Sequence, residues 1–339
     1  PEEKTEAQVD LQKTYPAWAP AKMRYVRPDR LRAVPQTVKR TLKNARNTTP
    51  PSLLDAPAPM TLWGNVIYQN TWGEEETHYG FYSFSTAPPI TALNLLGEDP
   101  TLIANGGSGV VDGVMHSVFL DMSLAMWGIV KAYHMQFDPE NWQRIAPPTE
   151  IDLSLAAFET AQDQTTGEIY GAFYNSDLTK REFGVVDFEN ETRTTFGTTD
   201  KAYVALGLST DGYLYGIATD GNLYKIDKTN GTETLIGSTG IELTDAEGSY
   251  YSQSGEIDQK TNTFYWASVD NAQQSALYTV DLATGAVTKI SDFPNGDIVL
   301  ALTVPKPLAE AGAPAAAEEL SVEFNEASLS GKVNFKAPT

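Results

Sequence analysis

Two glutamates, Glu159 and Glu256, are the strongest candidates for catalytic chemistry in this sequence. Each lies in a short run that we expect to form an inner strand of a β-sheet. Hydrolysis of a glycosidic bond uses two carboxyl groups about 5 to 10 Å apart, one of them with a raised pKa. If the protein is an enzyme, we expect these two side chains to be its catalytic pair.

Three aspartates near the same runs, Asp112, Asp163 and Asp258, have a structural explanation. Each begins a turn between two predicted strands. An aspartate in that position accepts hydrogen bonds from the turn backbone behind it. We therefore leave them out of the candidate catalytic pair.

The three histidines are His78, His116 and His134. Both His116 and His134 fall on predicted strands, where a packed histidine is a more ordinary expectation than a metal ligand. The chain has no cysteine, no nucleophile elbow and no phosphate-binding loop. We expect no metal site and no cofactor, and the residues favour a protein that is not an enzyme.

A repeat organises these residues. Its clearest copy is the segment 202–237, AYVALGLSTDGYLYGIATDGNLYKIDKTNGTETLIG. Turns are expected at Asp211-Gly212, Asp220-Gly221 and Asn230-Gly231, as two-residue hairpin turns in which both positions tolerate positive φ. The result is a four-stranded antiparallel meander of the size of one β-propeller blade.

The second half of the meander recurs as fifteen residues with an aspartate at the fifth place. The copies are FGVVDFENETRTTFG at 183–197, LYKIDKTNGTETLIG at 223–237 and LYTVDLATGAVTKIS at 277–291, with looser copies at 133–146 and 81–97. Equivalent second-strand positions are Trp63, His116, Tyr170, Tyr215 and Tyr265, which lie 53, 54, 45 and 50 residues apart. The sequence therefore predicts an all-β fold, a five-bladed β-propeller over residues 60–305.

The first blade lacks an inner strand of its own, because only a proline-rich segment precedes it. The late run IVLALTV at 298–304 resembles the inner strand YVALGLS at 203–209. We expect this late strand to complete the first blade and close the ring, since closure removes exposed sheet edges.

The flanking segments differ from the body in composition. Residues 1–59 form a proline-rich basic arm, whose first 49 residues carry 11 Lys/Arg and 5 Asp/Glu, whereas the whole chain has a net charge of −20. The acidic body argues against nucleic acid as a partner, and no apolar run is long enough for a transmembrane segment. Residues 306–319 read as a linker and 320–339 as the first strands of a β-sandwich, or as a tail docked on the propeller. The oligomeric state is left open.

Loop lengths predict where a ligand binds. Turns after first and third strands are short, whereas those after second and fourth strands are long, and long loops on a rigid scaffold commonly carry binding. The side chains expected to cluster there are Trp72, Glu74, Trp127, Tyr250 and Tyr251. Aromatic rings with carboxylates suit a glycan or protein ligand. The alternative is that the tryptophans only cover the end of the propeller.

The fifteen-residue repeat resembles that of bacterial extracellular β-propellers over residues 60–304, and SGKVNFKAPT looks like the opening of a fibronectin type III-like module. This combination is similar to secreted and surface lipoproteins of Bacteroidota, described as adhesins or as proteins of unknown function. The resemblance implies an extracellular or cell-surface location and a non-enzymatic binding role. Five-bladed propellers also include glycoside hydrolases, which keeps the carboxylate pair as an alternative, and a structural spacer is a third possibility.

Overall fold

The computed structural model describes residues 58–68, 79–99, 102, 105–121, 130–175, 179–245, 248–249, 252–272, 274–305, 318–325 and 330–336. The chain divides into two compact units, Pro1–Val304 and Pro305–Thr339. The expected basic arm lies outside the described residues except for its last two positions.

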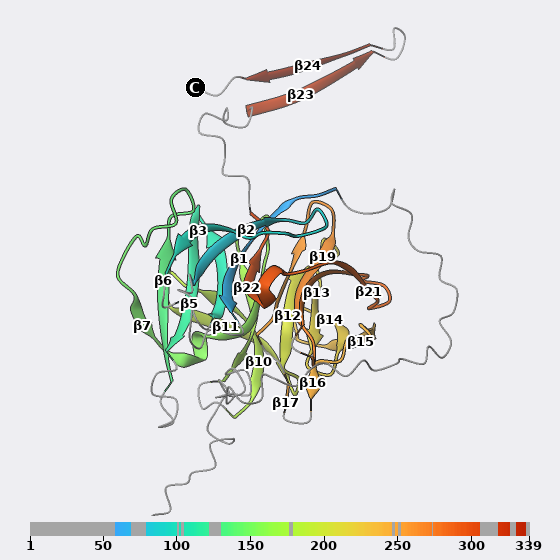
Figure 1. Cartoon of the computed structure of the whole chain (residues 1–339). Coiled ribbons are helices and arrows are strands. Elements are labelled where there is room, and N and C mark those ends of the chain that lie inside the picture. The colour runs from blue at the N-terminus through green and yellow to red at the C-terminus, as the bar shows by residue number, and fades with distance from the viewer. Residues whose placement is uncertain are drawn as a thin grey trace, which may run out of the picture. The chain divides into compact units, whose positions relative to one another are not determined.

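The first unit is a ring of five four-stranded antiparallel sheets, a five-bladed β-propeller as the sequence predicts (Figure 1). Blade 1 is β22 (Asp297–Thr303), β1 (Thr61–Tyr68), β2 (Gly80–Ser85) and β3 (Asn94–Glu98). Blade 2 is β4 (Asn105–Val111), β5 (Val114–Asp121), β6 (Lys131–Phe137) and β7 (Thr149–Ile151). Blade 3 is β8 (Ala157–Gln162), β9 (Ile169–Tyr174), β10 (Arg181–Asp187) and β11 (Thr192–Thr199). Blade 4 is β12 (Tyr203–Leu208), β13 (Leu214–Ala218), β14 (Asn222–Ile226) and β15 (Glu233–Ser238). Blade 5 is β18 (Ser254–Asp258), β19 (Thr263–Val269), β20 (Ser275–Val280) and β21 (Val287–Asp292).

Short elements join these blades. A two-stranded sheet of β16 (Thr244–Asp245) and β17 (Gly248–Ser249) follows blade 4, and single 3₁₀ turns occupy η3 (Leu153–Leu155) and η4 (Pro294–Gly296). The second unit contains β23 (Glu318–Asn325) paired antiparallel with β24 (Ser330–Lys336). A sheet of two strands is marginally stable in water.

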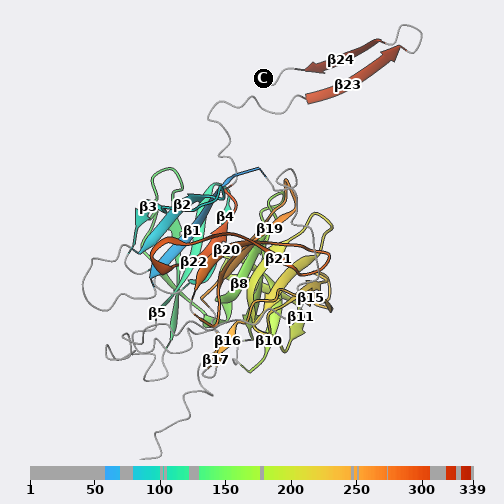
Figure 2. The same cartoon turned by 45° about the vertical axis from the view of Figure 1, so that its right-hand side comes forward.

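Ring closure follows the sequence prediction. Strand β22 pairs antiparallel with β1, from Trp63 opposite Thr303 to Tyr68 opposite Asp297. A late strand therefore forms the inner edge of the first blade, and the red β22 lies beside the blue β1 in both views (Figures 1 and 2). The five second-strand positions fall on β1, β5, β9, β13 and β19, one for each blade.

Burial falls from the axis of the ring to its rim. Every residue of β12, β18 and β22 is buried, whereas the outer strands β15 and β21 have no fully buried residue. Inner strands are buried on both faces, which explains the nearly continuous apolar runs of β12 and β22. The core is accordingly divided among the five boundaries between neighbouring blades.

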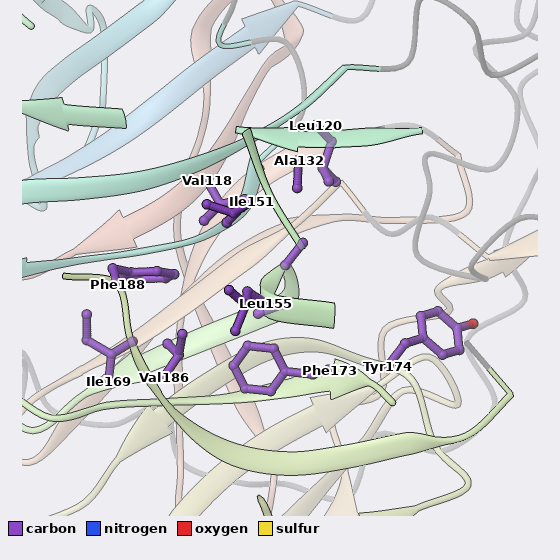
Figure 3. Close-up of a cluster of buried hydrophobic side chains, with 12 residues drawn as sticks. Val118, Leu120, Ala132, Ile151, Leu155, Ile169, Phe173, Tyr174, Val186 and Phe188 are labelled. Atoms are coloured by element: carbon purple, nitrogen blue, oxygen red, sulfur yellow. The ribbon is translucent and has the colours of Figure 1, made fainter. Parts of the chain in front are cut away.

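The boundary between blades 2 and 3 illustrates this division. Val118 and Leu120 of β5 meet Phe173 of β9 and Phe188, which follows β10. Figure 3 shows side chains of both blades gathered in one cluster, with Tyr174 at its margin. Burying an apolar side chain of this size stabilises the fold by about 1.5–3 kcal/mol, so these boundaries hold the ring together.

The last place of the fifteen-residue repeat is a contact between blades. A Cβ added to Gly237 would lie 2.2 Å from the carbonyl oxygen of Thr284 in the next blade, and Gly197 is similarly confined. The third copy has Ser291 at this place, where blade 5 meets blade 1. There the Ser291 Oγ accepts a hydrogen bond of 3.0 Å from the backbone N–H of Ile90. Glycine thus occupies this place at the boundaries of blades 3 and 4 and of blades 4 and 5, and serine occupies it at the closing boundary.

The turns differ from the two-residue type that the sequence predicts for blade 4. Only the glycine of each Asx-Gly pair has positive φ, at 82° for Gly212, 76° for Gly221 and 72° for Gly231. These are longer loops that end in a left-handed glycine, another common hairpin closure. Two consecutive positive φ values occur instead at Asp112 (48°) and Gly113 (81°), which join β4 directly to β5.

Candidate functional site

The structure brings Glu159 and Glu256 together at the propeller axis. They are the third residues of the inner strands β8 and β18, and each is 5% exposed. The backbone N–H of Gln162 on β8 donates a 3.3 Å hydrogen bond to Glu256 Oε2. Blades 3 and 5 are therefore joined through a carboxyl group although blade 4 separates them in the ring.

Each glutamate also accepts a hydrogen bond from the N–H of the residue that follows it. Thr160 N–H donates to Glu159 Oε1 over 3.0 Å, and Ile257 N–H donates to Glu256 Oε1 over 2.9 Å. Ser254 extends the connection, because its side chain hydrogen-bonds Glu159. These carboxyl groups are held by the backbone of the strands that carry them.

Ser254 also reaches the closing strand. Its Oγ accepts a 2.7 Å hydrogen bond from the backbone N–H of Leu302 on β22. One buried serine thus contacts Glu159 of blade 3 and the strand that closes blade 1.

Burial raises the pKa of both glutamates well above its usual value. Backbone hydrogen bonds act in the opposite direction, and the charge of Glu256 raises the pKa of Glu159 further. A glycosidase pair needs one protonated and one ionised carboxyl group, set apart by different environments. Here both environments favour the protonated form, so the pair is better suited to joining strands than to splitting a glycosidic bond.

Side chains also connect the inner strands of blades 2 and 3. Thr160 Oγ1 donates to the carbonyl of Ser108 over 2.9 Å and accepts from its N–H over 3.1 Å. Gln162 repeats this pattern two residues later, since its Oε1 accepts from the N–H of Val110 and its Nε2 donates to the carbonyl of Val110. These pairs take the place of a backbone ladder between strands of different sheets.

Two glutamines close one end of the axis. The N–H of Gln164 donates to Gln259 Oε1 over 3.0 Å, and the N–H of Gln259 donates to Gln164 Oε1 over 3.1 Å. The Nε2 of Gln259 donates to the carbonyls of Gln162 and Leu208, both over 3.1 Å. The turns after β8 and β18 are therefore bound to each other across the axis.

The aspartates beside these turns have the structural role expected of them. Asp163 Oδ1 accepts from the N–H of Thr165 over 2.9 Å, and Asp258 Oδ1 accepts from the N–H of Lys260 over 3.0 Å. Asp112 lies in the two-residue turn after β4.

His116 and His134 form a buried pair in blade 2. Their Nδ1 and Nε2 atoms, respectively, are 2.9 Å apart, and both rings stack against Phe188 of blade 3. Burial, followed by the neighbouring His134, lowers the pKa of His116 to about 4, and burial lowers the pKa of His134. Within the part of the chain that the structure describes, no three His, Cys, Asp or Glu side chains are grouped as a metal site would require.

The strand ends that flank the predicted ligand-binding segments share one face of the ring. Second and fourth strands end on this face, where third and first strands begin, and we call it the long-loop face. The opposite, tight-turn face carries the turns after first and third strands. All five predicted ligand-binding residues, Trp72, Glu74, Trp127, Tyr250 and Tyr251, lie outside the described residues.

One charged group at the long-loop face escapes sequence reasoning. Arg181, the first residue of β10, lies beside two aromatic rings that contact each other, with its Cζ 5.6 Å from the ring centre of Phe158 and 5.7 Å from that of Tyr174. A signal was present, because residues 60–304 contain only three arginines. Because arginine is scarce in this acidic part of the chain, each arginine is a candidate for a specific role.

Asp297 is the second group that sequence reasoning did not select. It is the first residue of β22, is 4% exposed, and its Oδ1 has no hydrogen-bond partner among the described residues. Burial raises the pKa of Asp297 from 3.8 to about 6. An acid directly before the apolar run IVLALTV was the available sequence signal.

Comparison with known proteins identifies the repeat but no activity. A family described as "Repeat of unknown function (DUF6923)" matches residues 151–301, which span blades 3 to 5 and most of β22. No curated protein matches the chain. Among the described residues, no helix has the length and hydrophobicity that a membrane crossing requires.

Solved structures similar to this chain include three from Bacteroides. A protein of unknown function from Bacteroides thetaiotaomicron VPI-5482 is 12% identical with a TM-score of 0.39, and the match covers 55% of this chain and 42% of that protein. A candidate 6-phosphogluconolactonase from Bacteroides uniformis ATCC 8492 is 11% identical with a TM-score of 0.38, covering 81% and 95%. Another from Bacteroides fragilis NCTC 9343 is 11% identical with a TM-score of 0.38, covering 84% and 95%.

Proposed function

We propose that this protein is a non-enzymatic binding module that recognises a glycan or protein ligand through the long-loop face of its propeller. The observation that carries the proposal is the enclosure of the axial carboxyl groups. Glu159 and Glu256 are each 5% exposed and are held by backbone N–H groups of the inner strands. Carboxyl groups that are buried and hydrogen-bonded in this way join the strands of the scaffold. Ligand binding is then expected on the surface of the propeller.

The positions of the propeller's ends support the choice of face. Strand β1 begins at Thr61 and β22 ends at Thr303, and the pairing of Trp63 with Thr303 places both ends on the tight-turn face. The chain therefore enters and leaves the ring on the side opposite the long loops.

We propose further that the protein works outside the cell or at the cell surface, as a secreted or anchored adhesion component. The absence of cysteine from the sequence is compatible with either redox environment, so the support for this location is the resemblance of the repeat to bacterial extracellular propellers.

A screen of glycan and protein arrays tests the proposed binding. Trp72→Ala and Trp127→Ala should abolish or strongly weaken the signal of any ligand that the wild-type protein binds. The matched control is Tyr213→Ala, because Tyr213 is an exposed aromatic residue on the tight-turn face. Equal binding by all three variants would remove the long-loop face as the site, and no ligand on any array would favour a structural spacer.

A carbohydrate-active enzyme is the second candidate, and the observation that favours it is that Glu256 lies near enough to Glu159 at the axis to raise its pKa. Turnover of an oligosaccharide by the wild-type protein, lost in both Glu159→Gln and Glu256→Gln, would establish this function. Turnover that survives both substitutions would exclude the pair as catalytic residues.

A further inference from the structure

We propose that Arg181 is the anchor of the long-loop face for a carboxylate group on the bound ligand. This inference rests on the proposed binding function and adds the chemical class of the ligand.

The guanidinium group is held in a fixed orientation. Phe158 on β8 and Tyr174 at the end of β9 place their ring centres 5.6 and 5.7 Å from its Cζ, both within cation–π range. Its Nη1 donates a 2.8 Å hydrogen bond to the carbonyl of Asp200. Three different strands or strand ends of blade 3 therefore position one side chain.

The same group has no counter-ion among the described residues. Arg144 is paired with Asp99, and Arg193 is paired with Glu182, whereas Arg181 forms no ion pair there. This is unexpected in a chain with 44 acidic residues and 24 basic ones. An arginine without an ion pair among the described residues of such an acidic protein is a candidate contact for a negative group on a partner.

The two remaining nitrogens of Arg181 indicate how a ligand would bind. Nε is buried and has no hydrogen-bond partner among the described residues. A buried donor without a partner is uncommon in folded proteins. Nη2 likewise has no hydrogen-bond partner among the described residues, and Arg181 as a whole is partly exposed. The terminal nitrogens can therefore donate to an acceptor that arrives from the long-loop face.

A carboxylate is the group that best fits this arrangement. A guanidinium donates parallel hydrogen bonds in its own plane, which matches a planar carboxylate, while its faces are free to contact aromatic rings. The ring centres of Phe158 and Tyr174 are 5.0 Å apart, so both rings lie to one side of the Arg181 Cζ, and the acceptor would approach from the other side. A uronic acid and an acidic peptide side chain both carry this group.

The experiment measures binding of defined probes by calorimetry at low ionic strength. The probes are trigalacturonic acid with its methyl ester, and a pentaglutamate peptide with its pentaglutamine counterpart. We expect one carboxylate probe to bind and its neutral counterpart to fail, which also tells a sugar source from a peptide source.

Three variants then test the residue itself. Arg181→Gln should weaken binding at least tenfold, and Arg181→Lys at least fivefold, because lysine keeps the charge but loses the planar edge. Lys180→Gln is the matched control, since it removes the same charge from the adjacent exposed residue, and it should change the Kd less than twofold. Thermal melting of each variant confirms that it is folded.

Two results would overturn the inference. One is failure of both carboxylate probes to bind the wild-type protein, and the other is equal weakening by Arg181→Gln and Lys180→Gln, which would indicate general electrostatic attraction. If array ligands without a carboxylate bind wild type and Arg181→Gln alike, the carboxylate anchor fails while the binding function stands. If nothing binds on any array, the binding function fails as well.

Discussion

Replacing Asp297 by asparagine should stabilise the propeller at neutral pH and have little effect in acid. Asp297 starts the strand that closes the ring, and it is buried with one carboxylate oxygen unpartnered. Because burial raises its pKa, the folded state prefers the protonated form. Deprotonation therefore destabilises the closed ring, and an amide cannot deprotonate.

The magnitude follows from linkage. Burial raises the pKa of Asp297 from 3.8 to about 6. At 1.36 kcal/mol per unit, the folded state loses about 3 kcal/mol relative to the unfolded chain between low pH and pH 8. The sign is set by the raised pKa, so this stability is lost as the pH increases from about 4 and the loss is complete above about 7.

The assay avoids the isoelectric point of about 4.5 by comparing melting temperatures at pH 5 and pH 8. About 1.4 kcal/mol of the loss falls in this interval, which corresponds to roughly 3–5 °C for a unit of this size. The difference in melting temperature between Asp297→Asn and the wild-type protein should therefore be roughly 3–5 °C larger at pH 8 than at pH 5. Subtracting the wild-type melt removes every titration that the two proteins share.

Glu140→Gln is the control, because Glu140 is an exposed carboxyl group whose loss changes the net charge equally. Its difference from wild type should be the same at both pH values. A pH-independent difference for Asp297→Asn, or one that grows toward acid, would refute the reasoning that this carboxyl group is desolvated in the folded state.

Three other predictions concern the blades and the axis. Gly237→Ala should destabilise the propeller by about 1–3 kcal/mol in urea unfolding, because its Cβ would lie 2.2 Å from the Thr284 carbonyl oxygen; an unchanged midpoint would contradict this packing. Glu256→Gln should melt increasingly above wild type as the pH rises, since a raised pKa makes the wild type lose stability with increasing pH; a constant difference would show that the carboxyl group is solvated. The wild-type protein should lose about 2 kcal/mol of unfolding free energy between pH 8 and pH 5 through His116, because a pKa lowered from 6.5 to about 4 makes protonation oppose folding. His116→Gln should remove this loss; an unchanged fall of melting temperature toward pH 5 in the variant would exclude this role of His116.

The architecture was predictable because short sequence patterns determine its strands and turns. Alternating apolar residues and the aspartate at the fifth place of the repeat mark the third strand and its turn, and Asp227 Oδ1 indeed accepts from the N–H of Thr229 over 2.8 Å. The similarity of IVLALTV to YVALGLS predicted the closing strand for the same reason, since both are buried on two faces.

Features that depend on irregular backbone were not predictable. The pairing of β8 with β9 shifts register between Ala157 and Glu159, so counting alternate residues along the sequence does not tell which way Glu159 faces. In blade 2 the looser copy at 133–146 predicts a returning strand that ends too early. Two prolines at 147 and 148 interrupt it, and β7 begins only at Thr149.

The candidate site was predictable only in part because it is assembled from distant segments. Glu159 and Glu256 were selected as acids on inner strands, but the proximity of the strands that carry them arises from the curvature of a ring that no short window encodes. The environment of Arg181 combines β8, β9 and β10, and depends on where three chain segments end.

The antiparallel pairing of β22 with β1 also determines how the propeller responds to mechanical tension. Trp63 and Thr303 are partners at the margin where both strands meet the adjoining chain. A pull applied to the two ends in opposite directions therefore loads this pair first and peels the strands apart one residue pair at a time, instead of shearing all their hydrogen bonds together. The β22–β1 pairing that closes the ring is thus the part of the propeller that opens first under force. The other blades bear the load only after it has opened.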